Sequence, residues 1–545
     1  MGCCKCTKSG EEFDNFVDNT SAHGFPQVKL SSSIFWKRTW KFVMIVCYGV
    51  AIWQLFDLFL KFTRFPTTTT VMHQYNPSIP FPGVTICNLN SIRKSQQHLV
   101  FGKNVTGEHM ALVAAEAILK NASRGMQGDK DFLPDEQGED DLTRFASNAL
   151  YGLRNASLAE FVGHDMIGSI GTCLFAYGRC YRDWFKQWHH GRYGNCMTVT
   201  VNKTLQYARS DLGLKMMLSV GIEEYISWLT ATAGLQIAIH PAYAVPFPEE
   251  NSVTVGPGQT TSLGITYQVT KRLKFPYDLK TCGDQADFDD MERNYTLYLP
   301  LYQMATGKAK PNYTFAACSR SCAQQLIMDK CRCVDTLSVH RRLVDTTDEY
   351  KNLPACTYGD AELACIDEVA SILFGETGRC GATDCPLPCY EEDYTIHVTS
   401  TKFPFWKFLD KYTLETWRIL HYKYNMSVEE IQKQAEQNHM SVPSHILLPA
   451  LKENATSESV RAVSDYLAEK QTSINVHFTR FNVLQFHKKE ALSPSSLLSN
   501  VGGTFGLYTG ASIMTGVEFV QLLCKICRKK PRPSIPWIDF PLEGF

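Results

Sequence analysis

Two long apolar stretches interrupt a chain in which hydrophobic and polar positions are otherwise mixed. The first stretch runs from about Phe42 to Phe62, and the second runs from about Leu497 to Cys524. Each stretch is close to the roughly 20 residues that a helix needs to cross a bilayer. We therefore predict two membrane-spanning helices, with a large region between them that lies outside the lipid.

The second apolar stretch is rich in small residues. Gly502 and Gly506 stand at four-residue spacing from the tripeptide Gly510-Ala511-Ser512, a pattern that lets helices approach closely. Glu518 follows, and an ionisable group at that depth usually faces protein or water. This combination favours a pore or vestibule. The alternatives are a structural hydrogen bond for Glu518 and a plain packing motif for the tripeptide.

The first apolar stretch carries polar residues near its outer end. Gln54, Asp57 and Lys61 follow one another at spacings of three and four positions, which places them on one helical face. We interpret this face as a helix–helix packing surface rather than a surface that contacts ions.

Short apolar or alternating runs in the middle region predict β-strands. Residues 81–89 are apolar and bounded by proline and asparagine, and residues 234–240 and 260–270 alternate. The proline- and glycine-rich run 246–258 predicts a long turn between the last two. Alternating apolar positions at 474–478 predict a last strand that leads into the second span.

Other parts of the middle region have a helical pattern. Residues 91–168 are helical and polar around an acidic loop at 134–141, and residues 318–333 and 405–420 are helix-like. Strands and helices together predict an α+β fold. Several subdomains are expected because roughly 430 residues exceed the 250–300 that one core usually holds.

Basic residues flank both spans. Lys37, Arg38 and Lys41 precede the first span, and Lys525 begins a basic run after the second. Positive charge stays on the cytoplasmic side, so both termini are expected in the cytosol of a multi-pass plasma-membrane protein. The predicted domains are a cytosolic N-terminus (1–41), a first span (42–62), an extracellular domain (63–496), a second span (497–524) and a cytosolic C-terminus (525–545).

Overall composition is that of an ordinary globular protein. The chain has 545 residues, of which 44% are hydrophobic and 20% charged, and its formal net charge is -1. This balance gives no indication of nucleic-acid binding, and membrane lipid is the expected surrounding of the spans. Near the start, Cys3, Cys4 and Cys6 are equally compatible with acylation and with free thiols.

Fourteen cysteines lie between the two spans, where an oxidising compartment is expected. They can form seven disulfides, but their spacing alone does not give the pairing. A zinc site is the poorer interpretation because the usual C-x2-C spacing is absent, so no metal is expected. These cysteines are Cys87, Cys173, Cys180, Cys196, Cys282, Cys318, Cys322, Cys331, Cys333, Cys356, Cys365, Cys380, Cys385 and Cys389.

Eight N-x-S/T sequons also lie between the spans, which predicts a glycoprotein. Their asparagines are Asn104, Asn121, Asn155, Asn202, Asn294, Asn312, Asn425 and Asn454.

No metal triad, nucleophile elbow or phosphate loop is visible, so the chain is not expected to be an enzyme. A disulfide-rich adhesion or receptor protein with two anchors remains the alternative from another class. Such an anchor has no evident need for the glycines and Glu518 of the second span.

Four segments together resemble the degenerin/epithelial sodium channel superfamily. They are His23-Gly24, FPGVTICNLNS (81–91), the cysteine run, and GGTFGLYTGASIMTGVE (502–518). The resemblance implies a trimer of identical or related subunits, each with a hand-like extracellular domain of β-palm, helical finger and helical thumb. It also implies the pairs Cys87–Cys196, Cys173–Cys180, Cys282–Cys389, Cys318–Cys385, Cys322–Cys380, Cys331–Cys365 and Cys333–Cys356.

The same resemblance assigns roles in ion conduction. Gly510, Ala511 and Ser512 would form a selectivity filter for permeant Na⁺ through their backbone carbonyls, with no cofactor. Ser499 and Asn500 would lie at the outer mouth of the pore, where bulk at Ser499 is expected to hinder closure, and Glu518 would hold cations in the inner pore. His23-Gly24 would be a cytosolic gating motif that re-enters beneath the filter.

The segment between the spans looks most similar to the invertebrate FMRFamide-gated branch, and the acid-sensing branch is the alternative. An amidated Phe-Met-Arg-Phe neuropeptide carries two cationic groups and two phenyl rings, so its site needs carboxylates and aromatic residues. The candidate residues are Asp135, Glu136, Phe161, Asp165 and Phe175, although a solvated role is favoured for the acidic loop.

Overall fold

The computed structural model describes residues 9–76, 78–102, 135–153, 155–274, 276–277, 282–283, 298–308, 311–337, 350, 352–356, 360–374, 378–381, 384–436, 440, 442–452 and 454–527. The chain divides into two compact units. One unit, the helical unit, combines residues 1–68 with 489–545, and the other, the large unit, comprises residues 69–488.

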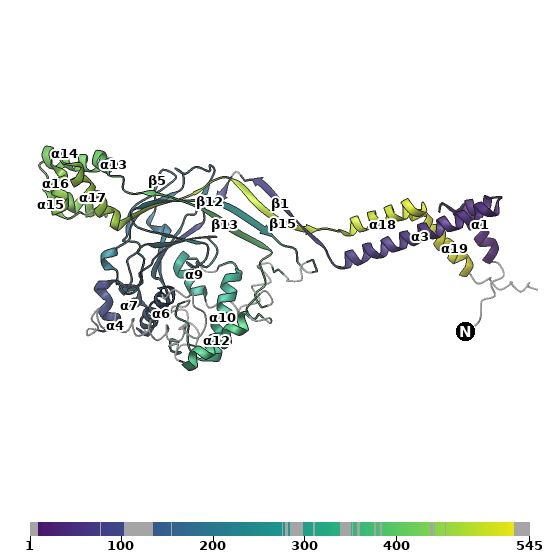
Figure 1. Cartoon of the computed structure of the whole chain (residues 1–545), viewed down its shortest axis with the longest axis horizontal. Coiled ribbons are helices and arrows are strands. Elements are labelled where there is room, and N and C mark those ends of the chain that lie inside the picture. Colours follow the sequence, from purple (N-terminus) through teal and green to yellow (C-terminus); the bar gives the residue numbers. More distant parts are fainter. Residues whose placement is uncertain are drawn as a thin grey trace, which may run out of the picture. The chain divides into compact units, whose positions relative to one another are not determined.

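The helical unit contains one long apolar helix and one bent pair. Helix α3 (Ile34–Thr63) is long and apolar enough to cross a membrane, and it begins earlier than the predicted first span. Helices α18 (Pro494–Thr509) and α19 (Ile513–Cys527) meet at an angle of 76° and together could form a second, broken span. Helix α18 packs along α3, and α19 turns away from it (Figure 1). Two shorter helices, α1 (Ser9–Asn19) and α2 (Phe25–Leu30), complete the unit.

Two sheets build the large unit. The eight-stranded sheet has the order β1-β15-β12-β14-β9-β4-β5, with β13 also paired to β12. Its strands are β1 (Thr67–Tyr75), β4 (Ile170–Phe175), β5 (Gly178–Arg179), β9 (Leu214–Ser219), β12 (Gln259–Lys271), β13 (Tyr390–Lys402), β14 (Gln471–Phe478) and β15 (Asn482–Glu490).

The second sheet has five strands in the order β11-β10-β3-β7-β6, and a two-stranded ladder pairs β2 with β8. The strands are β2 (Ile79–Pro80), β3 (Gly83–Asn88), β6 (Phe185–His190), β7 (Gly194–Thr200), β8 (Thr204–Leu205), β10 (Leu235–His240) and β11 (Ser252–Val255). Apolar residues of both sheets join one core, to which β3 contributes Val84 and Ile86 and β12 contributes Leu263.

Helices surround these sheets in three groups. Helices α13 to α17 gather at one end of the unit around a core of their own, and α9, α10 and α12 form a second group (Figure 1). Helices α4, α6 and α7 form the third group. The bounds are α4 (Gln97–Phe101), α6 (Asp135–Gly152), α7 (Ala156–Val162), α9 (Leu299–Thr306), α10 (Phe315–Cys331), α12 (Asp360–Phe374), α13 (Trp406–Phe408), α14 (Glu415–Lys423), α15 (Val428–Glu436), α16 (Ser444–Leu451) and α17 (Ser457–Lys470), with a π-helical turn at Leu409–Leu414.

The mixed α+β class and most predicted elements are confirmed, with three corrections. The acidic segment predicted as a loop belongs to α6 from Asp135 onward. The predicted long turn contains strand β11, whose alternating valines pair with β10. Strand β14 is not the last strand, because β15 follows it before α18.

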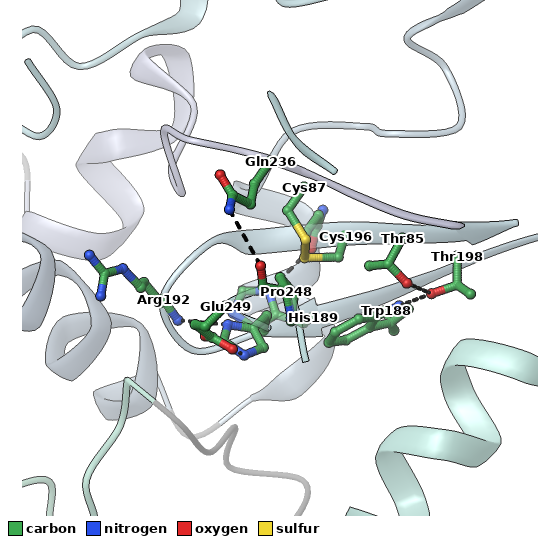
Figure 2. Close-up of a disulfide and its surroundings, with 12 residues drawn as sticks. Thr85, Cys87, Trp188, His189, Arg192, Cys196, Thr198, Gln236, Pro248 and Glu249 are labelled. Atoms are coloured by element: carbon green, nitrogen blue, oxygen red, sulfur yellow. Dashed lines mark hydrogen bonds and ion pairs between the residues drawn. A yellow bond between two sulfur atoms is a disulfide. The ribbon is translucent and has the colours of Figure 1, made fainter. Parts of the chain in front are cut away.

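Seven disulfides form in the large unit, and their pairs are the seven that the family resemblance implies. Cys318 and Cys322 lie one turn apart on α10, so their two bridges leave the helix from one face. Cys87 and Cys196 are directly opposite each other on β3 and β7. Beside this bridge, the hydroxyl of Thr198 contacts Thr85 and accepts a hydrogen bond from Trp188 Nε1 (Figure 2).

The sequon asparagines that the structure describes are all exposed, namely Asn155, Asn202, Asn312, Asn425 and Asn454. Glycosylation at these sites stays a prediction. Asn104, Asn121 and Asn294 lie outside the described residues.

Gly83 offers a test of the packing between β3 and β10. A Cβ atom at this position would lie 2.5 Å from Cε1 of His240, whose ring is fixed by a 2.9 Å hydrogen bond to Thr85. We expect Gly83→Ala to destabilise the detergent-solubilised channel by about 1–3 kcal/mol, because overpacking forces neighbouring groups to shift. Thermal unfolding monitored by size-exclusion chromatography measures this effect.

Gly256→Ala is the matched control, since its nearest neighbour would be 4.0 Å from the added Cβ. Equal melting temperatures for the two variants would contradict the packing described here.

Candidate functional site

The break between α18 and α19 follows from two capping motifs in direct succession. Gly510 ends α18 with φ 64°, a left-handed conformation that favours glycine, and its N–H bonds the Gly506 carbonyl at 3.1 Å. Ser512 then begins α19, because its N–H donates to the Thr515 hydroxyl at 3.0 Å and its own hydroxyl accepts from the Thr515 N–H at 3.4 Å. The tripeptide is therefore a helix stop followed at once by a helix start.

The loop of residues 20–24, which we call the N-terminal loop, packs against this break. The backbone N–H of His23 donates to the Thr509 carbonyl at 2.9 Å, which satisfies one of the carbonyls left open at the end of α18. The His23 ring lies so close to Gly510 that a Cβ there would be 2.3 Å from its Nδ1 atom. Gly510 is thus required for its backbone conformation and for this close approach.

Gly24 is constrained in the same way. Its φ is 95°, and an added Cβ would lie 2.8 Å from Cγ of Met44 on α3. The His23-Gly24 pair therefore packs between α3 and the helix break. The structure accounts for both residue types, because His23 contacts Gly510 and Gly24 contacts Met44.

Glu518 is bonded to the N-terminal loop. Its Oε2 atom accepts hydrogen bonds from the Thr20 hydroxyl at 2.9 Å and from the Ser21 N–H at 3.1 Å. The Ser21 hydroxyl also contacts the Thr515 hydroxyl at 2.5 Å. In this arrangement the carboxylate holds the loop against α19. This is the structural hydrogen bond that the sequence left open as an alternative for Glu518, but the sequence did not indicate its partners.

Apolar contacts support the same docking. Phe16 and Val17 of α1 pack with Leu522 of α19, and the Phe16 and Phe519 ring centroids are 4.7 Å apart. Helix α1 and the N-terminal loop are therefore fixed along α19 by both polar and apolar contacts.

A groove between α3 and α18 holds the two residues predicted at the pore mouth. Ser499 and Asn500 line it together with Gln54 and Asp57. Gln54 Nε2 donates to the Tyr508 hydroxyl at 3.0 Å, as expected for a helix–helix packing face. Asp57 and Lys61 form an ion pair of 2.7 Å along α3.

A model of the amiloride-sensitive sodium channel family matches residues 16–522 of this chain. The chain belongs to this family. Members of the family are plasma-membrane ion channels rather than enzymes, and the chain is a sodium channel of this kind. The match extends from α1 into α19, so it includes the N-terminal loop, the large unit and the helix break.

The sequences of individual relatives align with nearly the whole chain, at low identity. The FMRFamide-activated amiloride-sensitive sodium channel of Cornu aspersum is 21% identical, covering 93% of this chain and 82% of the relative. The bile acid-sensitive ion channel of Mus musculus is 24% identical, covering 94% and 87%. The acid-sensing ion channel 4-B of Danio rerio is 21% identical, covering 95% and 76%.

Among the residues predicted to bind a peptide, Phe175 is not accessible to a ligand in the structure. Phe175 is 4% exposed and packs edge-on against Phe81 and Trp184, so it belongs to the core rather than to a ligand pocket. Phe161 is exposed beneath the Arg93 guanidinium, and the Asp165 carboxylate accepts a hydrogen bond from the Gly168 N–H. The side chains of Asp135 and Glu136 are outside the described part of the structure.

A cavity in the large unit was missed by the sequence interpretation. It measures about 560 Å³ and is bordered by the segment after β10, the first turn of α10 and the start of β13. Its lining combines tyrosines with carboxylates, among them Tyr243, Tyr390, Glu392 and Asp393. The run Tyr390–Asp393 directly after Cys389 was the available sequence signal, but only the fold brings it beside β10 and α10.

Gly510→Ala should disrupt the helix break, because the substitution introduces a strained left-handed backbone and a clash with His23. We expect a loss of most of the current per channel at the cell surface, measured by voltage clamp together with surface biotinylation. Gly516→Ala is the control, since among the described residues no atom beyond the adjoining turns of its own helix lies within 4 Å of the added Cβ. Wild-type current from Gly510→Ala would show that the break does not depend on this glycine.

Proposed function

We propose that this chain is one subunit of a trimeric sodium-selective channel that an extracellular amidated neuropeptide opens. The main observation in support of ion conduction is the helix break at Gly510-Ala511-Ser512, which the N-terminal loop contacts. A helix break inside a membrane is tolerated where it lines a water-filled space or is buried in protein. Three such breaks around one axis would present backbone carbonyls to a passing cation.

The proposed topology places both termini in the cytosol and the large unit outside the cell. Basic residues at both cytosolic ends and the seven disulfides of the large unit support this orientation. Ser499 and Asn500, near the start of α18, would then lie at the outer mouth, and Glu518 would lie on the inner side of the filter.

In this proposal the N-terminal loop contributes to gating. It binds the Thr509 carbonyl and the Glu518 carboxylate at the same time, so it connects the two halves of the broken helix. Moving the loop would remove hydrogen bonds on both sides of the filter. No cofactor is needed for such a mechanism, and Na⁺ is the permeant ion.

Peptide gating is supported by the similarity to the FMRFamide-activated channel of Cornu aspersum over 93% of this chain. Proton gating is the second candidate, because acid-sensing relatives match a similar share. Burial lowers the pKa of His240 to about 4, and burial with the nearby Arg93 charge lowers the pKa of His164 to about 4. These two histidines stay neutral at mildly acidic pH, which makes them poor proton sensors.

The sodium-selectivity proposal is tested at Ser512. Exchanging external sodium for potassium should shift the reversal potential strongly in the wild type, and Ser512→Leu should reduce conductance or selectivity because the constriction has no space for bulk. Ser512→Ala separates added bulk from the lost helix-capping hydroxyl, since it removes the hydroxyl only. Equal sodium and potassium permeability in the intact wild type would refute sodium selectivity.

The gating proposal predicts a current on application of amidated Phe-Met-Arg-Phe and little current in steps to about pH 6. Voltage clamp of cells that express this chain alone measures both, with the non-amidated peptide as the control ligand. Acid steps stay above pH 5, because the unfolded chain would protonate His164 and His240 near pH 6.5, so the fold loses stability as pH falls from there toward 4. A robust acid current without any response to amidated peptides would favour the proton-gated alternative.

A further inference from the structure

We propose that the cavity between β10, α10 and β13, here called the tyrosine cavity, binds the guanidinium group of the activating peptide. This inference rests on the proposed function and names its site. The cavity lies wholly within the large unit, and its volume of about 560 Å³ falls in the usual range of ligand pockets, about 300–1,000 Å³.

Charge in the cavity lining favours a cationic ligand. Four carboxylates line it, those of Glu250, Glu391, Glu392 and Asp393, against the single guanidinium of Arg320. The imidazole of His240 also lies there and stays neutral because burial lowers its pKa to about 4. An anionic amphiphile such as a bile acid would meet net repulsion in this lining, although a relative of similar identity is named as bile acid-sensitive.

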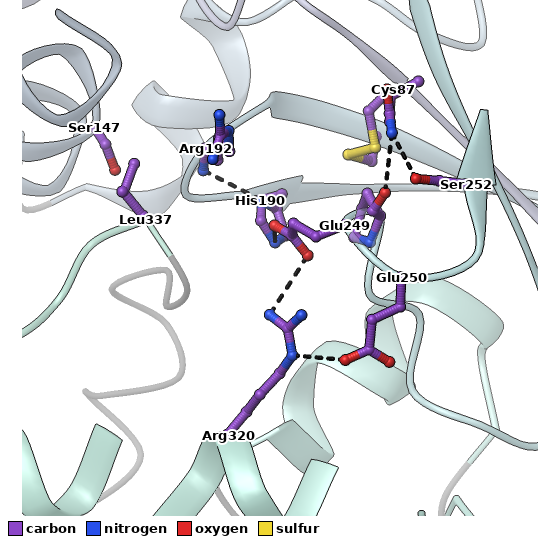
Figure 3. Close-up of polar contacts among 12 residues, drawn as sticks. Cys87, Ser147, His190, Arg192, Glu249, Glu250, Ser252, Arg320 and Leu337 are labelled. Atoms are coloured by element: carbon purple, nitrogen blue, oxygen red, sulfur yellow. Dashed lines mark hydrogen bonds and ion pairs between the residues drawn. A yellow bond between two sulfur atoms is a disulfide. The ribbon is translucent and has the colours of Figure 1, made fainter. Parts of the chain in front are cut away.

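Arg320 does not compensate the carboxylates of β13. Its Nε atom bonds Glu250 at 3.0 Å, its Nη1 atom is 3.5 Å from Glu249, and its guanidinium lies 4.6 Å from the Phe247 ring centroid. Figure 3 shows Arg320 directed at these two glutamates, with His190 on the far side of Glu249. This cation is therefore engaged by its own network.

Glu392 and Asp393 are the two carboxylates available to a ligand. Glu391 already pairs with Arg272 at 2.5 Å. In the described part of the chain, by contrast, Glu392 and Asp393 form no ion pair. Their hydrogen bonds come from neutral donors. The Tyr390 hydroxyl donates to Glu392 at 3.1 Å, the Tyr267 hydroxyl also bonds Glu392, and the Tyr394 N–H donates to Asp393 at 2.8 Å.

Neighbouring carboxylates add negative charge around Glu392 and Asp393. Burial and the Glu391 charge raise the pKa of Asp393, partly offset by the Tyr394 N–H. Burial and the Glu392 charge likewise raise the pKa of Tyr243 and of Tyr267. A bound cation would relieve this unfavourable concentration of negative charge.

Aromatic rings add a second type of contact for the same ligand. Tyr243, Tyr313, Phe315 and Tyr390 all line the cavity. Organic cations bind over such rings, and phenyl groups of a peptide pack against them. A single metal ion fits less well, because no group of three or more His, Cys, Asp or Glu side chains among the described residues is close enough to hold one.

A structural role is the competing explanation of the carboxylates. The first turn of α10 borders the cavity, and the partial positive charge of a helix N-terminus stabilises nearby anions. Under this explanation, neutralising Glu392 or Asp393 would lower the stability of the protein and leave its affinity for a peptide unchanged.

A double-mutant cycle between channel and peptide separates these explanations. Amidated Phe-Met-Arg-Phe and its analogue with citrulline in place of arginine are applied to wild type, Glu392→Gln and Asp393→Asn. On the wild type, we expect the citrulline analogue to need a half-effective concentration about 10- to 100-fold higher than the normal peptide. For the normal peptide, we expect at least one of the two carboxylate substitutions to raise the half-effective concentration by a similar factor. On that variant, replacing arginine by citrulline in the peptide should raise the half-effective concentration little further.

Controls address folding and location. Glu429→Gln removes an exposed carboxylate of α15 outside the cavity and should leave the dose response unchanged. Surface biotinylation and thermal unfolding show whether Glu392→Gln remains folded, and Asp393→Asn gives a second variant at a side chain that keeps more contact with solvent than Glu392. Equal sensitivity of every variant to the arginine-to-citrulline change would overturn the cavity as the site, while the peptide response of the wild type would still support the proposed function.

If the peptide evokes no current, binding of a fluorescent amidated Phe-Met-Arg-Phe peptide to the purified full-length channel is measured instead. Binding that weakens in Asp393→Asn but opens no channel would support the cavity and overturn peptide gating. Absence of both binding and current would overturn the site and the gating proposal together.

Discussion

Open backbone groups at a helix break are the constraint on which the helical unit depends. Ending one helix and starting another leaves several carbonyls and N–H groups without partners, and lipid offers none. The chain satisfies part of this need internally, through Gly510 at the end of α18 and Ser512 at the start of α19. The Thr509 carbonyl is satisfied from outside the pair, by the His23 N–H. The position of the N-terminal loop is therefore a consequence of the break.

This dependence explains why residues almost five hundred positions apart act as one structural element. The loop cannot approach the break closely unless Gly510 lacks a side chain, and it cannot turn toward α3 unless Gly24 adopts a positive φ beside Met44. Glu518 then fixes the other side of the loop through Thr20 and Ser21. The loop and the tripeptide are thus connected by direct contacts within one chain.

Much of this unit could be predicted from local patterns. The apolar runs marked the positions of α3 and of the bent pair α18–α19, and glycine followed by serine two positions later is the ordinary signal for a helix end and a new start. The partner of Glu518 could not be predicted, because a lone acidic residue in an apolar stretch does not indicate which distant donor approaches it. The start of α3 was missed because Ile34–Lys41 combines apolar and basic residues, which continue a helix without continuing the apolar run.

In the large unit, strands with clear alternation were predictable, and their partners were not. Strand β11 is only four residues long and lies within a proline- and glycine-rich run, so its turn signals outweighed its alternating valines. The acidic start of α6 shows the same conflict, since acidic residues suit both a solvated loop and the first turn of a helix. Phe175 was predicted to bind a peptide because aromatic residues suit both cores and pockets, and only its packing against Phe81 and Trp184 distinguishes the two.

Family membership and ligand identity depend on different kinds of residue. At 21–24% identity over most of the chain, relatives named for a peptide and for bile acids share one family with this protein. Caps, close approaches and disulfides need a few residue types at fixed places, so the channel architecture persists while most side chains differ. A ligand site is defined by the charge and shape of its lining, which can change without disturbing that architecture. For this chain the ligand chemistry is therefore indicated by the cavity itself, where Glu392 and Asp393 lie among tyrosines without a cationic partner in the described part of the chain. A cation with aromatic groups is the ligand chemistry that such a lining favours.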